Sequence, residues 1–385
     1  MKKISILTAT RAEYGLLKPL IIALKDTKLF DVRVVVTGMH LSPEFGLTYK
    51  EIESDGIEID DKIEMLLSAD TPSAISKSMG LAMISFADYF ERLKPDMLIV
   101  LGDRYETLAI STVAMNQRIP IAHIHGGEST EGLIDEAIRH AITKLSYLHF
   151  TSTNEYRNRV IQLGESPDRV FCVGALGVEN IMKESLMNIS ELEDSIGFKL
   201  DKPYSVVTFH PVTLEDSSAK RQITELIKAC ELFENMKFIF TKANSDAEGR
   251  IINLEIDNFV MNNENALAVT SLGMKRYLSA LKYAEFVIGN SSSGIVEVPS
   301  FKIPTINIGD RQKGRIQASS VINCNAEFKA IVSAIEKEKT EEFIEIAKNT
   351  VNPYEKKDTA INITSIIIKY LSTNNIDIKK KFYDL

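Results

Sequence analysis

Short apolar runs alternate with amphipathic segments along most of the chain. In the first half, short runs rich in β-branched and other apolar residues predict strands at residues 4–8, 32–37, 97–101, 121–124, 147–151 and 170–173. Apolar positions at helical spacing predict helices between them, at residues 16–25, 73–93, 106–116, 136–145 and 155–163. Strands without polar alternation, separated by helices, are typical of a parallel sheet covered on both faces. The pattern therefore predicts a doubly wound α/β domain.

The same alternation restarts near residue 204 and predicts a second Rossmann-like domain. Its expected strands are residues 204–208, 238–241, 266–269, 286–288 and 305–308, and its expected helices are residues 218–233, 248–261 and 275–283. The charged stretch 186–202 is the expected join, and residues 358–371 read as a last amphipathic helix. We therefore expect an N-terminal domain at 1–185, a C-terminal domain at 186–357, and a final segment, 358–385, whose helix crosses back to the first domain.

Composition narrows the functional classes. A chain of 385 residues, 44% hydrophobic and 25% charged, fits a globular protein with two domains of ordinary size. The net charge of −8 argues against a nucleic-acid partner. No window approaches 18 uninterrupted apolar residues, and the N-terminus enters a strand without a signal-peptide pattern, so we expect a cytoplasmic protein with no membrane partner. The three cysteines have no metal-type spacing and imply no disulfide framework.

The most informative segment is the small polar turn 289–294, between the apolar run 286–288 and the start of a helix. Free N–H groups converge at such a turn, which makes it a candidate anion site, although an ordinary helix cap has the same pattern. Glu297 follows at a position suited to accept two ribose hydroxyls. A second phosphate-friendly segment, 309–315, follows another strand. Together the two segments predict a binding site for a nucleotide diphosphate.

Carboxylates follow the strands of the first domain. Asp103 comes after the strand 97–101, Glu128 follows the strand 121–124, and Asp135 and Glu136 begin the next helix. The carboxyl ends of parallel strands share one edge of the sheet, so these groups are candidates for acid/base chemistry. Asp135 alone also fits a simple N-cap.

Histidines and an arginine complete the set of candidates. His123 and His125 alternate on a predicted strand, so we expect them on opposite faces. His210 lies just beyond a strand of the second domain, where we expect it to face the first. Arg11 opens the helix expected from residue 16 and suits an anion site, a cap or an interdomain salt bridge. The chain has no dinucleotide fingerprint, P-loop or nucleophilic-hydrolase motif, so no nicotinamide is expected.

Eight motifs together resemble the hydrolysing UDP-N-acetylglucosamine 2-epimerases of bacterial sialic acid synthesis. They are TRAEYG at 10–15, VTGMH at 36–40, GDRYE at 102–106, HIHGGE at 123–128, IDEAIRH at 134–140, FHP at 209–211, NSSSG at 290–294 and GDRQKGR at 309–315. The resemblance runs from residue 4 to about residue 320.

The resemblance implies a GT-B-like fold with the active site in the cleft between two Rossmann-like domains. It implies elimination of UDP across C1–C2 of UDP-N-acetylglucosamine, followed by hydration of 2-acetamidoglucal to N-acetylmannosamine. It also implies a homodimer or homotetramer without a cofactor or catalytic metal. By resemblance, Asp103 and Asp135 transfer protons and His210 lies near the diphosphate. The nucleotide-binding positions by resemblance are Arg11, Ser291, Ser292, Gly294 and Glu297, with Arg311 and Arg315 in the charged loop.

One position departs from the family pattern, because many members have Glu where this chain has His125. Either His125 or Glu128 then supplies the missing acid/base group. Related enzymes act on UDP- or GDP-linked N,N'-diacetylbacillosamine for legionaminic acid synthesis, and that substrate stays open. A non-hydrolysing epimerase is disfavoured because Ala12 stands where such enzymes usually carry Pro. A GT-B glycosyltransferase is the alternative class, and a non-catalytic nucleotide-sugar sensor is a third.

Overall fold

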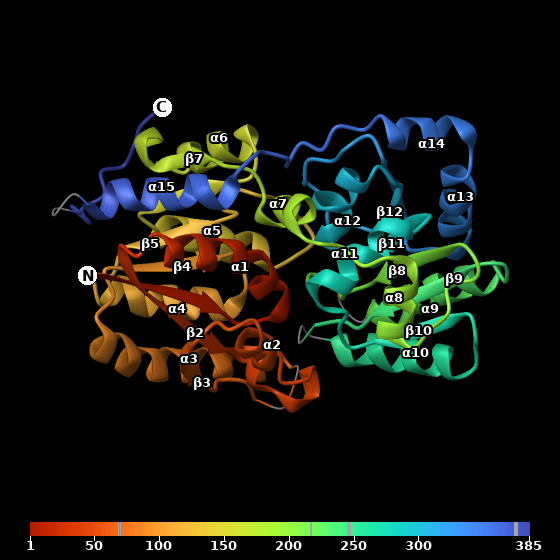
Figure 1. Cartoon of the computed structure of the whole chain (residues 1–385), viewed down its shortest axis with the longest axis horizontal. Helices are drawn as coiled ribbons and strands as arrows, with labels where there is room; N and C mark the ends of the chain where they lie inside the picture. The colour runs from red at the N-terminus through yellow and green to blue at the C-terminus, as the bar shows by residue number, and fades with distance from the viewer. Residues whose placement is uncertain (68, 70, 216–217, 245–247, 373–375) are drawn as a thin grey trace. The chain divides into compact units, whose positions relative to one another are not determined.

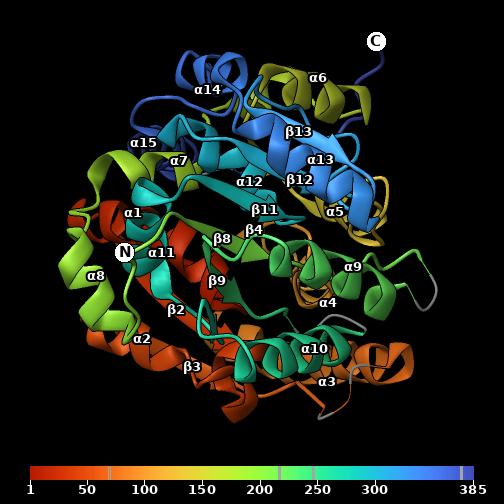
Figure 2. The same ribbon diagram turned by 90° about the vertical axis from the view of Figure 1, so that its right-hand side faces the viewer.

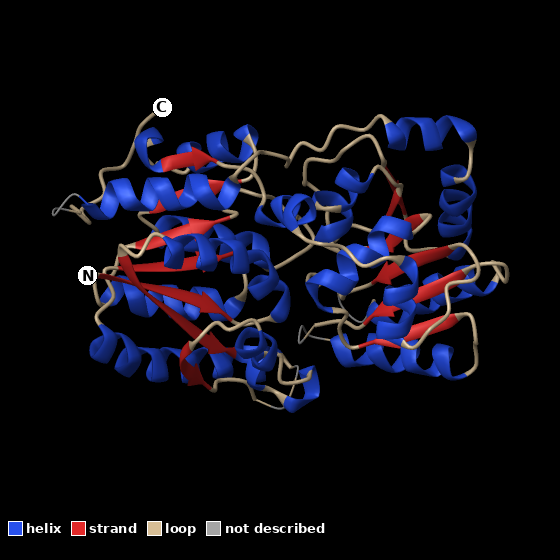
Figure 3. Ribbon diagram, viewed as in Figure 1, coloured by secondary structure: helices blue, strands red, loops and turns tan. Residues whose placement is uncertain are grey.

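The computed structural model describes residues 1–67, 69, 71–215, 218–244, 248–372 and 376–385. Helices and strands alternate along the chain, as Figures 1 and 3 show. The fold divides into two compact units. Unit 1 comprises Met1–Glu128, Asp135–Asn180 and Tyr354–Leu385, and unit 2 comprises Ser129–Ile134 and Ile181–Pro353.

Unit 1 is built on a seven-stranded, wholly parallel sheet in the order β3-β2-β1-β4-β5-β6-β7. The strands are β1 (Lys2–Thr8), β2 (Phe30–Thr37), β3 (Ile59–Ile63), β4 (Met97–Leu101), β5 (Ile121–Ile124), β6 (Leu148–Thr151) and β7 (Val170–Cys172). The helices are α1 (Arg11–Asp26), α2 (Tyr49–Ser54), α3 (Pro72–Leu93), α4 (Tyr105–Asn116), α5 (Asp135–Leu145), α6 (Asn154–Gln162) and α15 (Thr359–Ser372), and α7 (Leu176–Lys183) spans the division between the units.

Alternate strand residues of unit 1 enter two different cores. Ile4 and Ile6 of β1 pack with α1 and α15 on one face, whereas Leu7 packs with α3 and α4 on the other. This is the period of two expected for a sheet covered on both sides. The strand order reverses between β1 and β4, so the turns that follow these two strands lie at the topological switch point, where ligands of open α/β sheets bind.

Unit 2 repeats the plan with a six-stranded parallel sheet in the order β10-β9-β8-β11-β12-β13. Figure 2 views it with α9, α10 and α13 in front of the sheet, and these three helices share one core. Its switch point lies between β8 and β11. The strands are β8 (Tyr204–Thr208), β9 (Lys237–Thr241), β10 (Ala266–Val269), β11 (Phe286–Gly289), β12 (Thr305–Ile308) and β13 (Val321–Cys324). The helices are α8 (Ile189–Ile196), α9 (Ala219–Glu231), α10 (Gly249–Met261), α11 (Gly273–Tyr283), α12 (Ser292–Val296), α13 (Phe328–Glu338) and α14 (Glu341–Lys348).

One helix start expected from the sequence was wrong, and one helix was not expected. The first helix begins at Arg11 rather than near residue 16, because Thr10 caps it and Glu13 completes a capping box. The expected join at 186–202 contains α8, which Asn188 caps in the same way with Glu191. In both cases the caps, rather than the apolar period, determine where the helix starts.

Four short 3₁₀ turns complete the described elements: η1 (Gly38–Leu41), η2 (Pro43–Phe45), η3 (Pro167–Arg169) and η4 (Val298–Phe301). Among the helices formed by the described residues, none combines the length and the apolar character needed to cross a membrane.

Candidate active site

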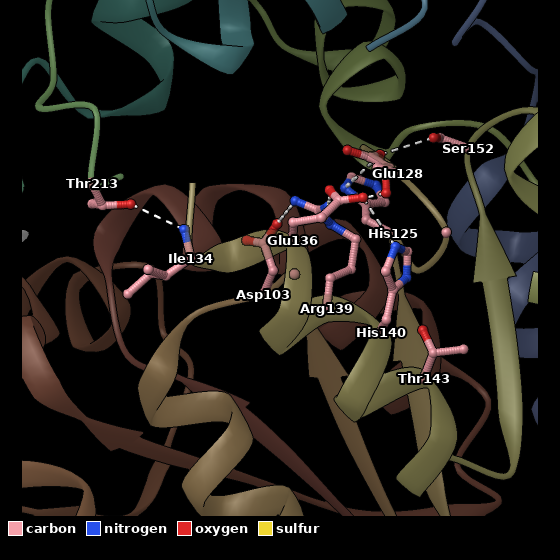
Figure 4. Close-up of polar contacts among 12 residues, drawn as sticks. Asp103, His125, Glu128, Ile134, Glu136, Arg139, His140, Thr143, Ser152 and Thr213 are labelled. Carbon is pink, nitrogen blue, oxygen red and sulfur yellow. Dashed lines mark hydrogen bonds and ion pairs between the residues drawn. The ribbon is translucent and has the colours of Figure 1, made fainter. Parts of the chain in front are cut away.

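Arg139 organises the candidate catalytic groups of unit 1, as Figure 4 shows. Its side chain is 1% exposed and lies on α5. One terminal nitrogen donates to the Asp103 carboxylate, and the other donates to Glu136 Oε2 at 2.8 Å and to the Glu128 carbonyl oxygen at 3.0 Å. A single buried guanidinium therefore joins the segment after β4, the segment after β5 and the start of α5.

The structure brings His125 and Glu128 together. His125 Nδ1 lies 4.0 Å from Glu128 Oε1, which also accepts a hydrogen bond from Ser152 Oγ at 3.0 Å. The expectation that His123 and His125 alternate on one strand was wrong, because β5 ends at Ile124 and His125 has a left-handed φ of 66°. That turn directs His125 toward Glu128. The two residues that could supply the acid/base group of the family's usual glutamate therefore lie close together.

His123 supports the catalytic edge from inside the sheet. It is fully buried, and its Nε2 lies 2.7 Å from the Gly102 carbonyl oxygen, directly before Asp103. Burial lowers the pKa of His123 to about 3, although the bond to Gly102 opposes this shift. The ring is therefore neutral near pH 7, and a proton on Nε2 can be donated to that carbonyl.

Asp135 and Arg11 lie at helix starts in unit 1. Asp135 is the first residue of α5, one turn before Arg139, and is half-buried. Arg11 is the first residue of α1, and its Nη1 lies 3.7 Å from Glu51 Oε1 on α2. This ion pair lies within unit 1, whereas the salt bridge considered from the sequence was one between the domains.

A buried carboxyl pair lies near the switch point of unit 1. Glu13 Oε2 accepts the backbone N–H groups of Ala9 and Thr10 at 2.7 and 3.2 Å. The pKa of Glu13 is raised to about 7. Burial is the main cause, Arg104 opposes the shift, and Glu106 adds to it. Arg104 in turn donates to the fully buried Glu106 at 3.2 Å. These groups hold the turn that carries Arg11.

Asn290 organises the candidate nucleotide site of unit 2. Its side chain is bonded to both backbone groups of His210: Oδ1 accepts the His210 N–H at 2.7 Å, and Nδ2 donates to the His210 carbonyl at 2.8 Å. The Asn244 N–H lies 3.5 Å from His210 Nδ1, which favours the tautomer with the proton on Nε2. The amide thus ties the turn after β11 to the turn after β8.

The charged loop after β12 is tied to the same residue. Gln312 Nε2 and Arg311 Nη1 donate to the Asn290 carbonyl at 2.9 and 3.2 Å. Gln312 is 1% exposed, whereas Arg311 and Arg315 are half-buried. The segments 289–294 and 309–315, which the sequence predicts to bind phosphate, are therefore neighbours.

The helix after the serine turn is short. α12 spans five residues, and Glu297 is its C-cap. Ser291 caps α12 by accepting the Ser293 N–H at 3.3 Å. A helix this short has a small dipole, so the anion-binding capacity of the turn rests on its local N–H groups and hydroxyls, including Ser292.

Gly294 has a packing role in addition to any nucleotide contact. A Cβ atom at this position would lie 2.8 Å from Thr305 Cγ2 of β12. Thr305 Oγ1 also donates to the Gly294 carbonyl at 2.8 Å. The missing side chain therefore lets α12 pack closely on the sheet.

Arg139, Asn290 and Gln312 were not selected as site residues from the sequence. The spacing of Glu136 and Arg139 on one helix is a usable signal, because residues three apart on a helix are neighbours. Asn290 and Gln312 act through contacts with residues far along the chain, which no local pattern reveals. Within the described residues, no cluster of three or more His, Cys, Asp or Glu side chains could hold a metal ion.

Solved structures place these two parallel-sheet domains in the GT-B-like fold class. UDP-N-acetylglucosamine 2-epimerase from Neisseria meningitidis, solved with UDP-N-acetylglucosamine bound, superimposes with a TM-score of 0.80. The match covers 97% of this chain and 100% of that chain at 19% identity, so it supports the fold alone.

Sequence similarity then gives the family. Residues 22–368 match the UDP-N-acetylglucosamine 2-epimerase family, to whose hydrolysing branch the chain belongs. It is 45% identical to GDP/UDP-N,N'-diacetylbacillosamine 2-epimerase (hydrolyzing) of Campylobacter jejuni, over 89% of this chain and 88% of that one. It is 43% identical to polysialic acid biosynthesis protein P7 of Escherichia coli, over 100% of this chain and 98% of that one.

Proposed function

We propose that this protein hydrolyses UDP-N-acetylglucosamine to UDP and N-acetylmannosamine, with inversion at C2. The observation that carries the proposal is the array around Arg139, which holds Asp103 beside the segments that carry Glu128 and His125. Such an array supplies fixed carboxylates for proton transfer at a weakly acidic carbon. Family membership supports the reaction type, and the full-length similarity to P7 supports a sugar of sialic acid synthesis.

The first step is an elimination. A carboxylate of unit 1 removes the proton on C2, the C–H electrons form the C1=C2 double bond, and the C1–O electrons leave with the diphosphate. We assign the base to Asp103 or Asp135. The buried ion pair with Arg139 fixes the position of Asp103, which suits it to accept or direct the proton.

The second step is a hydration. Water adds its oxygen to C1 of 2-acetamidoglucal, and a proton reaches C2 on the face opposite to the one it left. The contact between His125 and Glu128 suits a pair that shares one proton and can deliver it. The sum is one UDP-sugar and one water giving UDP and N-acetylmannosamine.

The departing UDP is assigned to unit 2. His210, with the proton favoured on Nε2, and the arginines Arg311 and Arg315 would stabilise the charge that develops on the diphosphate. Ser291, Ser292 and the backbone of Gly294 would bind the phosphates, with Arg11 of unit 1 assisting. Glu297 would accept the ribose hydroxyls.

Proton NMR of the protein with UDP-N-acetylglucosamine in D2O tests the reaction. The expected products are free UDP and N-acetylmannosamine deuterated at C2. Asp103→Asn and His210→Ala should each lower kcat about 100-fold or more, the effect of losing an acid/base group. Asp88→Asn, an exposed carboxyl on α3, is the matched control and should turn over normally. Normal rates in both site variants would contradict these assignments.

A second candidate substrate is UDP- or GDP-linked N,N'-diacetylbacillosamine, which the similarity to the Campylobacter enzyme favours. The same NMR assay with that sugar decides between the two by the ratio of kcat/KM. Transfer of the sugar to an added acceptor with release of UDP, and with no hydrolysis, would instead indicate a GT-B glycosyltransferase. By family resemblance we also propose a cytoplasmic homodimer or homotetramer, which light scattering after size-exclusion chromatography tests.

A further inference from the structure

The short segment 129–134 belongs to unit 2, although its neighbours on both sides belong to unit 1. Glu128 immediately precedes the segment and Asp135 immediately follows it. Two candidate acid/base residues are therefore attached to the ends of six residues that unit 2 holds. The contacts that hold these six residues set where both carboxyl-bearing residues leave the segment.

One set of contacts comes from the charged loop. The Glu131 N–H donates to the Lys313 carbonyl at 3.0 Å. The side chains of these two residues also form an ion pair at 3.7 Å, but both are more than half exposed, so the pair adds little. The backbone hydrogen bond is therefore the significant link.

Glycines let this loop and the segment approach each other closely. A Cβ atom at Gly132 would lie 2.8 Å from the Asp310 carbonyl oxygen, and one at Gly314 would lie 2.7 Å from Ser129 Oγ. Gly314 also has a φ of 91°, which favours glycine. The segment thus lies against the loop backbone at Gly132, and the side chain of Ser129 lies against the loop at Gly314.

The other set of contacts comes from the turn after β8. Thr213 Oγ1 accepts the Ile134 N–H at 3.1 Å, as Figure 4 shows, and the Leu214 N–H donates to the Gly132 carbonyl at 3.3 Å. This turn also carries His210. The last residue of the segment is therefore fixed by a side-chain hydroxyl directly before Asp135.

The chain of contacts continues to the serine turn. Gln312 and Arg311 of the charged loop donate to the carbonyl of Asn290, which directly precedes Ser291. The nucleotide turn, the charged loop and the segment are thus linked by consecutive hydrogen bonds within one unit.

We propose that the segment 129–134 is a positioning element that couples nucleotide binding in unit 2 to the placement of Glu128 and Asp135, and that Thr213 and Gly132 are positioning residues. The inference rests on the proposed function for the roles of those two carboxyls and of the serine turn. It predicts that weakening the contacts between the segment 129–134 and the rest of unit 2 lowers the rate of the chemical step and leaves the affinity for UDP unchanged.

Thr213→Val removes the hydroxyl that accepts the Ile134 N–H and conserves the shape of the side chain. We expect kcat to fall about two- to tenfold, the effect of one neutral hydrogen bond, with KM and the Kd for UDP unchanged. Thr213→Ser restores the hydroxyl and should recover kcat. Thr224→Val, which removes an exposed hydroxyl bonded to Lys220 on α9, is the matched control with normal kcat.

Gly132→Ala forces the segment away from Asp310 and should lower kcat further, about 10- to 100-fold, because small misplacements of catalytic groups are costly. Thermal unfolding of each variant must match the wild type within a few degrees, so that a loss of rate is not a loss of fold. A variant that weakens UDP binding in proportion to its loss of kcat/KM would contradict a positioning role.

Hydrogen exchange of the wild type, with and without UDP, tests the coupling without any turnover. We expect UDP to slow exchange in peptides that cover 290–315 and also in those that cover 129–134, with the second effect reduced in Thr213→Val. Protection of 290–315 alone, together with normal kcat in Thr213→Val, would overturn the inference and leave the proposed function standing. No UDP-dependent protection anywhere would overturn the nucleotide assignment, and the inference with it.

Discussion

Asn290→Asp is the substitution for which the structure gives the sharpest expectation. The Asn290 side chain is 1% exposed, and its two polar atoms match the N–H and the carbonyl of His210 at 2.7 and 2.8 Å. Aspartate keeps the acceptor for the N–H. It replaces the donor with a carboxylate oxygen that faces the His210 carbonyl oxygen at hydrogen-bond distance.

The expected cost has two parts. Loss of one hydrogen bond costs about 1 kcal/mol, and a buried charge without a partner at that atom costs about 2–3 kcal/mol more. Asn290→Asp should therefore lower the free energy of unfolding by about 3–4 kcal/mol at pH 8. A protonated carboxyl can again donate to the carbonyl, so the deficit should shrink at pH 5.

Urea unfolding followed by far-UV circular dichroism measures this deficit, because the chain contains no tryptophan to report by fluorescence. Asn290→Ala is the matched control: it loses both bonds and introduces no charge, so its deficit should be the same at pH 5 and pH 8. The reasoning is refuted if the aspartate deficit is below about 1 kcal/mol at pH 8, or if it does not change with pH.

Three further results are expected. Arg139→Met should lower the free energy of unfolding by about 3–5 kcal/mol and abolish turnover, because it leaves the carboxylates of Asp103 and Glu136 without their cationic partner. Arg139→Lys should recover part of the stability but little activity. Urea unfolding measures the stability of both variants, and the NMR assay measures their turnover. Because the pKa of Glu13 is raised to about 7, the folded protein binds more protons there than the unfolded chain, so the contribution of Glu13 to stability should fall as pH rises from about 4.5 to 7. Over this range the wild type should lose on the order of 3 kcal/mol of unfolding free energy relative to Glu13→Gln, and pH profiles of the same shape would contradict the assignment. EDTA should leave turnover unchanged, since the charge on the departing diphosphate is assigned to arginines and backbone N–H groups; strict loss of activity would overturn that.

The central strands could be predicted from the sequence because they are buried on both faces and read as continuous apolar runs. β1, β4, β5 and β8 follow this rule. The edge strand β3 was missed because its sequence, IDDKI, is half-exposed and carries three charges. This strand lies at the edge of its sheet, where partial exposure permits polar residues and no apolar pattern is required.

The candidate site could be predicted only in part. Residues that follow strands, such as Asp103 and His210, were found because strand ends mark the functional edge of a parallel sheet. The conformation of His125 could not be foreseen, because the apolar pattern that locates β5 does not fix the φ of the residue that follows it. The position of the segment 129–134 depends on hydrogen bonds of its backbone to residues about 80 and 180 positions away. No local sequence pattern predicts such contacts.

The return of the chain to unit 1 has a consequence for synthesis. Ala360, Ile363 and Ile367 of α15 belong to the same core as α1 and the first strands. When the first 350 residues have been synthesised, every strand of both sheets exists, yet this face of unit 1 still lacks its cover. The part of the chain that forms unit 2 ends at Pro353, before α15 is made. The final step in completing the core of the first domain therefore follows synthesis of the second, and the nascent first domain exposes an apolar surface to chaperones until α15 packs on it.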